Sequence, residues 1–267
     1  MTDTPTNNAN GPASAMPVVV MTAGGLNPTL VIQALAARNA DIHVILEQPE
    51  SKLDITRRRA RRLGGVAAIG QLATMIAARL LRKLANKRIR QILDAHNLTD
   101  TMPGNVAVHQ VTSINDQETR ALIAQIRPAA ILLVSTRLMA RKQLAAMPCP
   151  VLNLHAGINP AYRGQMGGYW SRRLNDACNF GATVHLVDAG TDTGGTLYEV
   201  RTTPAAGDFI STYPLVLTVA ALDITCRAVA DALASNLQPI APKGSSALHF
   251  PPTLWSWIFH GITRRIW

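Results

Sequence analysis

The chain has 267 residues, 48% of them hydrophobic and 16% charged, a balance that is typical of one large folded domain and excludes a disordered chain. Its three cysteines, Cys149, Cys178 and Cys226, lie far apart without metal-site spacing, which favours a reducing cytoplasm and no metal requirement. The formal net charge is +10, and eleven arginines and lysines with no acidic residue lie between Ile55 and Leu93. The positive charge is therefore concentrated in one segment.

The first part of the chain alternates strand and helix patterns. Residues 1–16 are small and polar, and we expect a flexible tail rather than a signal peptide. An apolar strand closed by a glycine pair (17–25) precedes a helical pattern (26–40), and a second strand (41–48) precedes the basic segment. That segment predicts two helices, broken at Gly64 and Gly65.

The rest of the chain continues this alternation. Strands are expected over 105–111, 129–135, 151–155, 181–188 and 195–200, and helices over 115–127 and 211–235. Asn115 or Asp116 is expected to cap the helix at 115–127. The pattern indicates an α/β fold with a Rossmann-like, mostly parallel sheet and helices on both faces. A basic helical insertion follows the second strand, and a helical extension ends the chain. No apolar run is long enough to span a bilayer.

The strand at 151–155 ends with two polar side chains, Asn153 and His155. Residues two apart in a strand point to the same face, and working groups of parallel sheets lie at the carboxyl ends of strands. An amide donor beside an imidazole suits a reaction in which a carbonyl oxygen becomes an oxyanion while a nucleophile loses a proton. Taken singly, a histidine at a strand end is more often a hydrogen-bonded packing residue, so both readings stay open.

A carboxylate is expected to control the imidazole. The candidates are Asp188, at the end of a strand, and Asp192, in the glycine-rich turn that follows. A carboxylate in a dry crevice favours the protonated ring and can take a proton through water. An aspartate in such a turn is ordinarily only a turn residue, and spacing alone does not decide.

Two linked motifs resemble those of the folate-dependent formyltransferases, a family that includes methionyl-tRNA, glycinamide ribonucleotide and sugar-nucleotide formyltransferases. The first motif is matched by Asn153, His155, Pro160, Tyr162, Arg163 and Gly164. The second is matched by Gly181, Thr183, Asp188, Gly190, Asp192, Thr193 and Gly194. The resemblance covers roughly residues 17–205 and implies a formyltransferase-like catalytic domain over 17–208. This catalytic domain would contain the basic helical insertion at about 51–95. Residues 209–267 would form a helix and an aromatic tail that pack on the same domain.

The resemblance implies that Asn153, His155 and Asp192 form a catalytic trio. The donor would be 10-formyltetrahydrofolate and the acceptor a primary amine. Asn153 and His155 would stabilise the tetrahedral oxyanion, and Asp192 would hold the histidine charged and relay the proton of the amine. The pterin pocket would be lined by Leu133, Ser135, Arg137, Leu138, Met139, Val187, Asp188 and Gly190. The acceptor would meet Gly24, Gly25, Asn27, Tyr162, Arg163 and Gly164.

The acceptor is less well determined than the donor. The loop of Gly24 and Gly25 opens a helix expected from Pro28, and helix N-termini attract anions, although a plain tight turn is the alternative. The family usually has Ser at the position of Gly157 and often Leu at that of Asn159. These loop positions are expected to face the acceptor.

The residues around Tyr162 match the motif of the tRNA and sugar enzymes more closely than that of the purine enzyme. The tRNA enzymes have a second domain, however, and the sequence after Ser235 is short for such a domain. The first expectation is a small phosphorylated or nucleotide-linked amino sugar. A formyltetrahydrofolate hydrolase, in which water replaces the amine, is the alternative.

The basic segment at 57–90 allows several partners. Contact with RNA, peripheral contact with an anionic membrane, a cradle for a phosphorylated acceptor and a solvated helix face all fit a charge run of this kind. The absence of interleaved aromatic residues argues against stacking on single-stranded bases.

Near the C-terminus, an interfacial anchor, a cap on the core and a homodimer contact are the alternatives for Trp255, Trp257, Phe259 and Trp267. A non-catalytic binding module on the same fold is a further alternative.

Overall fold

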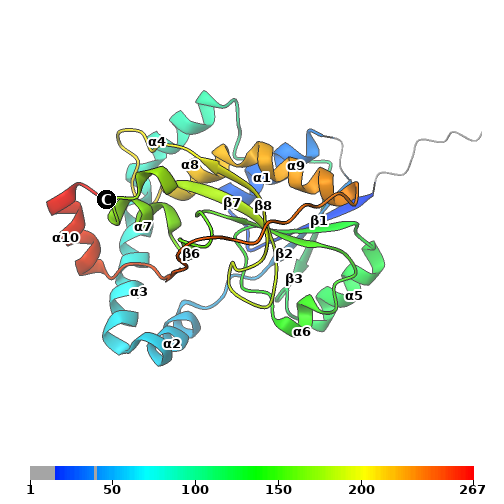
Figure 1. The fold of residues 1–267 in the computed structure, drawn as a ribbon, viewed down its shortest axis with the longest axis horizontal. Helices are drawn as coiled ribbons and strands as arrows, with labels where there is room; N and C mark the ends of the chain where they lie inside the picture. The colour runs from blue at the N-terminus through cyan, green and yellow to red at the C-terminus, as the bar shows by residue number, and fades with distance from the viewer. Residues whose placement is uncertain (1–15, 39–40) are drawn as a thin grey trace, which may run out of the picture.

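A seven-stranded sheet forms the centre of the protein, in the order β3-β2-β1-β4-β5-β7-β8 (Figure 1). The structure is a computed structural model that describes residues 16–38 and 41–267, so the expected tail at 1–16 lies outside the described residues except for Met16. The strands are β1 (Pro17–Thr22), β2 (Asp41–Glu47), β3 (Ala107–Val111), β4 (Ala130–Leu133), β5 (Val151–His155), β7 (Gly181–Leu186) and β8 (Thr196–Arg201). All pairs from β3 to β5 are parallel. The α/β, mostly parallel Rossmann-like fold is thus confirmed.

The last two strands run antiparallel to their neighbours. β7 and β8 are joined only by the turn at 187–195, which is too short for a crossover helix and therefore allows only an antiparallel pair. This turn contains Asp188 and Asp192 and starts beside the amino end of β5, where the amide of Val187 donates to the carbonyl of Val151 at 2.8 Å. From there the turn reaches back along β5, so that the Asp192 carboxylate lies 3.3 Å from Asn153 Nδ2 and 3.6 Å from His155 Nδ1.

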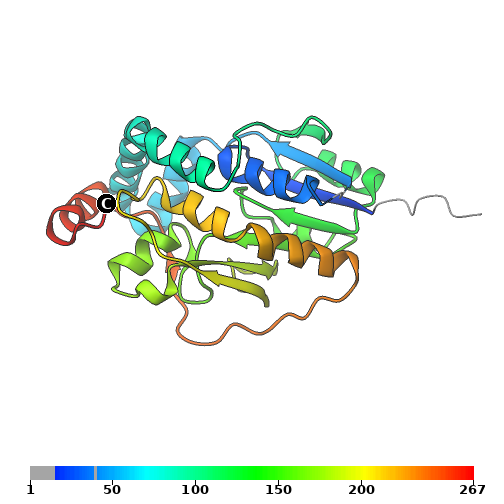
Figure 2. The same cartoon turned by 90° about the horizontal axis from the view of Figure 1, so that it is seen from above.

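Both faces of the sheet are covered, which explains why the strands are apolar without interruption. Val18 and Val20 of β1 face a core shared with α1 (Leu26–Ala36), α8 (Tyr213–Ala220) and α9 (Leu222–Leu233). The alternate residues Val19 and Met21 face a second core with α5 (Gln117–Ile126) and α6 (Arg141–Leu144). In Figure 2 the blue helix α1 lies beside the orange helices α8 and α9 over one face.

The insertion after β2 consists of three helices, where the sequence predicts two. They are α2 (Lys52–Leu63), α3 (Gly65–Leu80) and α4 (Arg82–Ala95). The predicted break occurs at Gly64, which has a φ of +88°. A second break at Leu81 turns α4 back, so that Ile92 and Leu93 pack against Leu30 of α1. The insertion is therefore held to the main domain by apolar contacts of α4.

Two further local predictions are corrected. The single helix expected over 211–235 is divided at Ala221, a fully buried residue at the junction of α8 and α9. Neither predicted cap bonds the start of α5: Asp116 occupies the N-cap position without a side-chain hydrogen bond. Asn115 instead accepts a 2.7 Å bond from the amide of Ala140 and donates to the carbonyl of Leu138 at 3.1 Å. Longer-range contacts outweigh local preference at both places.

The remaining short elements join the two halves of the chain. They are β6 (Arg163–Gly164), α7 (Gly167–Arg173), the 3₁₀ helix η1 (Ala177–Asn179), β9 (Leu248–His249) and α10 (Leu254–Arg264). β6 and β9 form a separate two-stranded parallel sheet. α10 packs against α3, and Trp257 and Ile266 enter the main core. Within the described residues, no helix has both the length and the apolar character that crossing a bilayer requires.

Candidate active site

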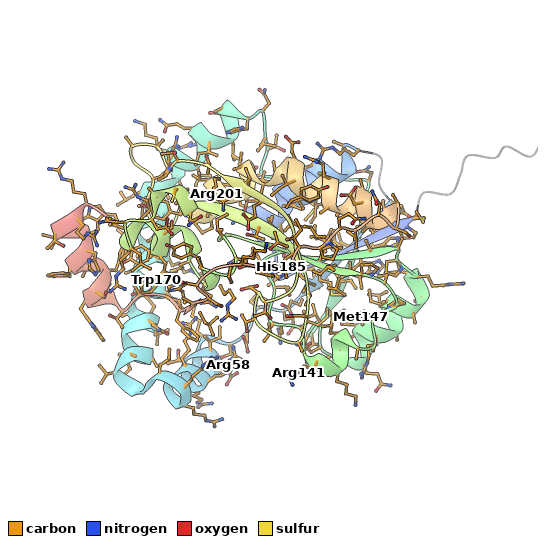
Figure 3. All side chains as sticks on the ribbon, in the orientation of Figure 1. Arg58, Arg141, Met147, Trp170, His185 and Arg201 are labelled. Atoms are coloured by element: carbon orange, nitrogen blue, oxygen red, sulfur yellow. The ribbon has the colours of Figure 1, made fainter. Side chains whose placement is uncertain are left out.

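A cavity of about 1140 Å³ opens at the carboxyl ends of β1, β2, β4 and β5. This position follows from the topology, because parallel strands present their ends at one edge of the sheet. Helix α2 forms part of the wall through Ile55, Arg58 and Arg62. In Figure 3, His185 lies near the centre of the view, with Arg58 of α2 and Arg141 of α6 below it. The basic insertion thus contributes directly to the cavity.

The carboxylate of Asp192 brings the candidate catalytic residues together. Its Oδ1 lies 3.3 Å from Asn153 Nδ2 and 3.4 Å from His185 Nε2. Its Oδ2 lies 3.6 Å from His155 Nδ1 and accepts a 2.8 Å hydrogen bond from the amide of Gly164. Asn153, His155 and Asp192 therefore form one cluster at the edge of the cavity, although 39 and 37 residues separate the aspartate from the other two.

Asp192 is held in its ionised form. Burial alone raises the pKa of this carboxyl, but the neighbouring His155, the hydrogen bonds from His185 and from the amide of Gly164, and the charge of His185 outweigh it. Together they lower the pKa of Asp192 from 3.8 to about 2. A carboxylate that is ionised and largely removed from water can stabilise positive charge on an adjacent imidazole.

The orientation of His155 is set by a backbone carbonyl. Its Nε2 lies 2.7 Å from the carbonyl oxygen of Tyr162, which can only accept, so we assign a hydrogen to Nε2. The Nδ1 atom is then the ring nitrogen that faces Asp192 and can gain or lose a proton there. The side chain is 6% exposed, so little water competes for these contacts. Its environment therefore suits proton transfer at Nδ1.

The glycines of this loop have defined steric roles. A Cβ atom on Gly157 would lie 2.6 Å from both His155 Nε2 and the carbonyl oxygen of Tyr162. Gly164 has a φ of +91°, and a Cβ there would lie 2.4 Å from the carbonyl oxygen of His249. Positions 157 and 159, which are expected to face the acceptor, are not among the residues that line the cavity: Gly157 lies against the His155 ring, and Asn159 is buried at 5% exposure.

His185 is a member of the cluster that the sequence analysis missed. Its Nδ1 lies 2.7 Å from the carbonyl oxygen of Leu186, and its Nε2 lies 3.1 Å from Asn153 Nδ2. The two residues are direct partners in the antiparallel pairing of β5 with β7. A neutral His185 accepts a hydrogen from Asn153, and a protonated one donates to Asp192. The two-residue spacing of His185 and Thr183 along β7 indicated that both side chains point to the same face of the sheet. Only the register of β7 against β5 shows that His185 lies beside Asn153.

Glu47 is a second missed residue, buried at 2% exposure at the end of β2 and lining the cavity. Its Oε1 accepts hydrogen bonds from Thr136 Oγ1 at 2.5 Å and from the amide of Arg137 at 2.8 Å. Its Oε2 accepts from the amide of Ile114 at 3.2 Å and lies 2.5 Å from Arg137 Nε. A charged residue that ends a buried strand was the available signal. Glu47 holds the loop after β4 in place at the cavity.

The eight residues expected to bind the pterin all line the cavity: Leu133, Ser135, Arg137, Leu138, Met139, Val187, Asp188 and Gly190. The structure also separates the two candidate carboxylates. Asp188 Oδ1 accepts bonds from the amide of Gly190 at 2.9 Å and from Thr193 Oγ1 at 2.6 Å, so it shapes the turn. Asp192 is the carboxylate that reaches the His155 ring.

Only some of the residues expected to meet the acceptor line the cavity. Asn27 and Gly164 line the cavity, whereas Gly24, Gly25, Tyr162 and Arg163 lie outside its lining in the described chain. Tyr162 is buried and donates a 2.7 Å bond to Asp176 Oδ2, and burial together with that carboxylate raises the pKa of the phenol. Arg163 donates to the carbonyl of Thr191 at 3.0 Å, which braces the turn before Asp192. Helix α1 begins at Leu26 rather than Pro28.

Across residues 16–38 and 41–267, no group of three or more histidine, cysteine or acidic side chains has the arrangement of a metal site. The cluster around Asp192 is instead held by hydrogen bonds and ion pairs among its own members. Its chemistry is that of donors and proton carriers, with an amide, two imidazoles and one ionised carboxylate.

This chain is similar to known proteins in sequence and in fold. The sequence model of the family described as formyl transferase matches residues 16–213. A methionyl-tRNA formyltransferase of Koribacter versatilis is 30% identical over 119 residues, which is 44% of this chain and 36% of the relative. One from Chlorobium chlorochromatii is 25% identical over 53% of this chain and 42% of its own length. The matched parts therefore span about two fifths of these curated relatives.

Solved structures share the fold. A sugar N-formyltransferase from a Shewanella species superposes with a TM-score of 0.55 at 14% identity, covering 88% of this chain and 76% of its own. A phosphoribosylglycinamide formyltransferase from Anaplasma phagocytophilum superposes with a TM-score of 0.55 at 12% identity, covering 87% of this chain and 96% of its own. At these identities the likeness concerns the arrangement of strands and helices.

Proposed function

Because this chain belongs to the formyl transferase family, we propose that it transfers a formyl group from 10-formyltetrahydrofolate to a primary amine. The proposed acceptor is a small phosphorylated or nucleotide-linked amino sugar. One observation carries the proposal: the ionised Asp192 joins Asn153 and His155 at the edge of a cavity large enough for both substrates.

The cavity fits the folate donor. Leu133, Met139 and Val187 supply an apolar lining, and the loop after β4, held by Glu47, supplies backbone groups for a flat polar ring. This mixture of apolar walls and a few fixed polar groups is usual for cofactor-sized ligands. The wall formed by α2 lies on the other side and leaves room for a second substrate.

In the proposed reaction the acceptor nitrogen bonds to the formyl carbon, and the formyl oxygen becomes an oxyanion. Asn153 Nδ2 carries two hydrogens and can direct one at the oxyanion while the other faces Asp192. Protonated His155 donates from Nδ1, and Asp192 stabilises its charge. The bond from carbon to the folate nitrogen then breaks. The amine loses one proton and the released tetrahydrofolate nitrogen gains one, with His155 and Asp192 as carriers.

Of the two arginines of α2 that line the cavity, Arg58 is paired with a carboxylate, whereas Arg62 has no acidic partner within the described residues and supports an anionic acceptor. Arg58 forms a two-pronged ion pair with Glu50, at 2.5 and 2.9 Å, and lines the cavity. Arg62 also lines the cavity and lies over the ring of Phe250, with 5.2 Å from its guanidinium carbon to the ring centroid. The planar guanidinium of Arg62 is well suited to a phosphate, because it can donate two parallel hydrogen bonds.

The test is to incubate the protein with 10-formyltetrahydrofolate and nucleotide-linked or phosphorylated amino sugars. We expect a mass gain of one formyl group on the acceptor, matched by release of tetrahydrofolate. Release of formate at the same rate without any acceptor would instead identify a hydrolase. Arg62→Gln should raise the KM for the acceptor roughly tenfold and leave that for the folate unchanged. Arg57→Gln is the matched control, since Arg57 is 74% exposed and outside the cavity lining.

A further inference from the structure

Helix α3 presents its aliphatic side chains outward and its polar ones inward. Val66, Ile69, Ile76 and Leu80 share one face by helical spacing, and all four are exposed, with Leu80 at 73%. Gln71 and Thr74 of the same helix are buried, and Thr74 Oγ1 donates a 2.8 Å bond to the carbonyl of Pro252. A surface helix ordinarily shows the reverse pattern.

Helix α10 repeats this arrangement and joins the same surface. Trp255, Ile258, Phe259 and Ile262 are spaced as one helical face and are exposed, whereas Trp257 is buried in the core. α10 lies beside α3 at one end of the molecule (Figure 1). Their contact is close, because a Cβ atom on Gly70 of α3 would lie 2.4 Å from Trp255 Cη2.

The two faces meet where Trp255 covers Gly70. We call them the α3–α10 surface, made of Val66, Ile69, Ile76 and Leu80 with Trp255, Ile258, Phe259 and Ile262. Contiguous apolar patches of this kind mark sites that bind a partner.

The two helices that form this surface carry no acidic residue of their own. No aspartate or glutamate lies between Ile55 and Leu93, and none follows Asp231 in the sequence. Arg79 on α3 and Arg264 and Arg265 at the end of α10 are exposed at the margins. Apolar and tryptophan side chains bordered by arginine are the composition of helices that lie in a membrane interface.

We propose that the α3–α10 surface docks on an anionic lipid bilayer, with its apolar side chains among the acyl chains and its arginines at the headgroups. A second copy of this chain is a poorer occupant, because it would bring another protein of net charge +10 against the same basic margins. An anionic membrane satisfies both the apolar and the positive character.

The docking surface adjoins the cavity. His249 and Phe250 line the cavity, and α10 begins at Leu254, only a few residues later. Arg62 stacks on Phe250 from α2, which packs against α3. Docking would therefore place the proposed active site beside lipid headgroups. The docking proposal does not depend on the reaction, since it concerns residues outside the cavity lining.

The test is co-sedimentation of the whole protein with vesicles of phosphatidylglycerol mixed with phosphatidylcholine, and with vesicles of phosphatidylcholine alone. We expect binding to the anionic vesicles that weakens as salt is raised. Combined substitution Ile69→Ser, Ile76→Ser and Leu80→Ser should lower the partition constant at least about tenfold, because apolar groups are withdrawn from the bilayer. Phe259→Ser with Ile262→Ser should do the same independently.

The matched control is Val108→Ser with Ile240→Ser, which removes side chains of similar exposure on β3 and beside β8 and should leave binding unchanged. Thermal unfolding followed by circular dichroism checks that each variant folds. Failure to bind anionic vesicles at low salt overturns the proposal. Binding that survives both sets of serine substitutions also overturns it and points to charge alone, as with RNA. A dimer in sedimentation equilibrium that these substitutions dissociate, without vesicle binding, assigns the surface to a second copy.

Discussion

At the carboxyl end of β5, charged and polar groups are buried and paired, whereas on α3 the polar side chains are buried and the aliphatic ones are exposed. Asp192 is 13% exposed and each of its oxygens has partners, while Ile69 is 64% exposed. Both regions depart from the usual distribution of polar and apolar residues. In the first, neighbouring groups compensate the buried charge. In the second, the described residues leave apolar area exposed, as the proposed docking requires.

The difference separates two kinds of functional site. A proposed catalytic site needs fixed donors and charges in a dry environment, because their effect is largest where water is excluded. A docking site needs accessible apolar area, because its gain in free energy comes on binding. The proposed catalytic site should therefore be sensitive to single polar substitutions. Substitutions in the docking site should change binding and leave other properties of the protein unaffected.

The largest expected effect is on catalysis at His155. His155→Ala should lower kcat roughly 10²–10⁴-fold, because both the donor to the oxyanion and the proton carrier are lost. The measurement is formation of the formylated acceptor under saturating substrates. His109→Ala is the matched control, since His109 lies on the edge strand β3 against His43 and should leave turnover unchanged. Near-normal turnover of His155→Ala would remove the residue from the mechanism.

A large effect on stability is expected at Glu47. Glu47→Gln should lower the free energy of unfolding by roughly 3–5 kcal/mol, because Arg137 loses its buried partner. Urea denaturation followed by circular dichroism measures it. Glu199→Gln is the control: its ion pair with Arg201 is partly exposed and should contribute about 0–1 kcal/mol. Equal losses in the two variants would contradict the structural role assigned to Glu47.

Asp192 should contribute to stability in acid. Its pKa is lowered from 3.8 to about 2, so its contribution is complete above the unfolded value and is lost as pH falls from about 4 to about 2. The amount is about 2 kcal/mol. Asp192→Asn should remove this part of the pH dependence, measured as the free energy of unfolding at neutral pH and near pH 3. An unchanged difference between those two values would show that other carboxyls account for it.

The smallest effect is expected on the α3–α10 surface in the absence of lipid. Ile69→Ala should change the free energy of unfolding by no more than about 0.5 kcal/mol, because the side chain is already in water. Ile45→Ala in β2, where the same side chain is fully buried, should cost roughly 2–5 kcal/mol. Urea denaturation of both variants measures the cost of the same isoleucine-to-alanine change on the α3–α10 surface and in the core. A large loss at Ile69 would mean that α3 packs against the fold through this face.

Much of the fold was open to prediction, because period-2 and period-3.6 patterns reflect local burial. The helix breaks at Leu81 and Ala221 were missed, since no local glycine or proline marks them and contacts with other helices decide them. At the site, the polar end of a buried strand indicated Asn153 and His155, and the family resemblance implied Asp192. His185 was missed because its role depends on which residue of β5 it pairs with, and register is a property of the sheet.

The sequence by itself determined the alternation of strands and helices, the position of the polar residues at strand ends and the concentration of positive charge, because each depends on residues close together along the chain. Only the tertiary structure decided that Asp192 rather than Asp188 reaches His155, and that Gly157 lies against the imidazole ring. It alone decided which face of α3 meets solvent, since helical periodicity shows a stripe but not its direction. Contacts between distant segments set these features, and they exist only once the chain has folded.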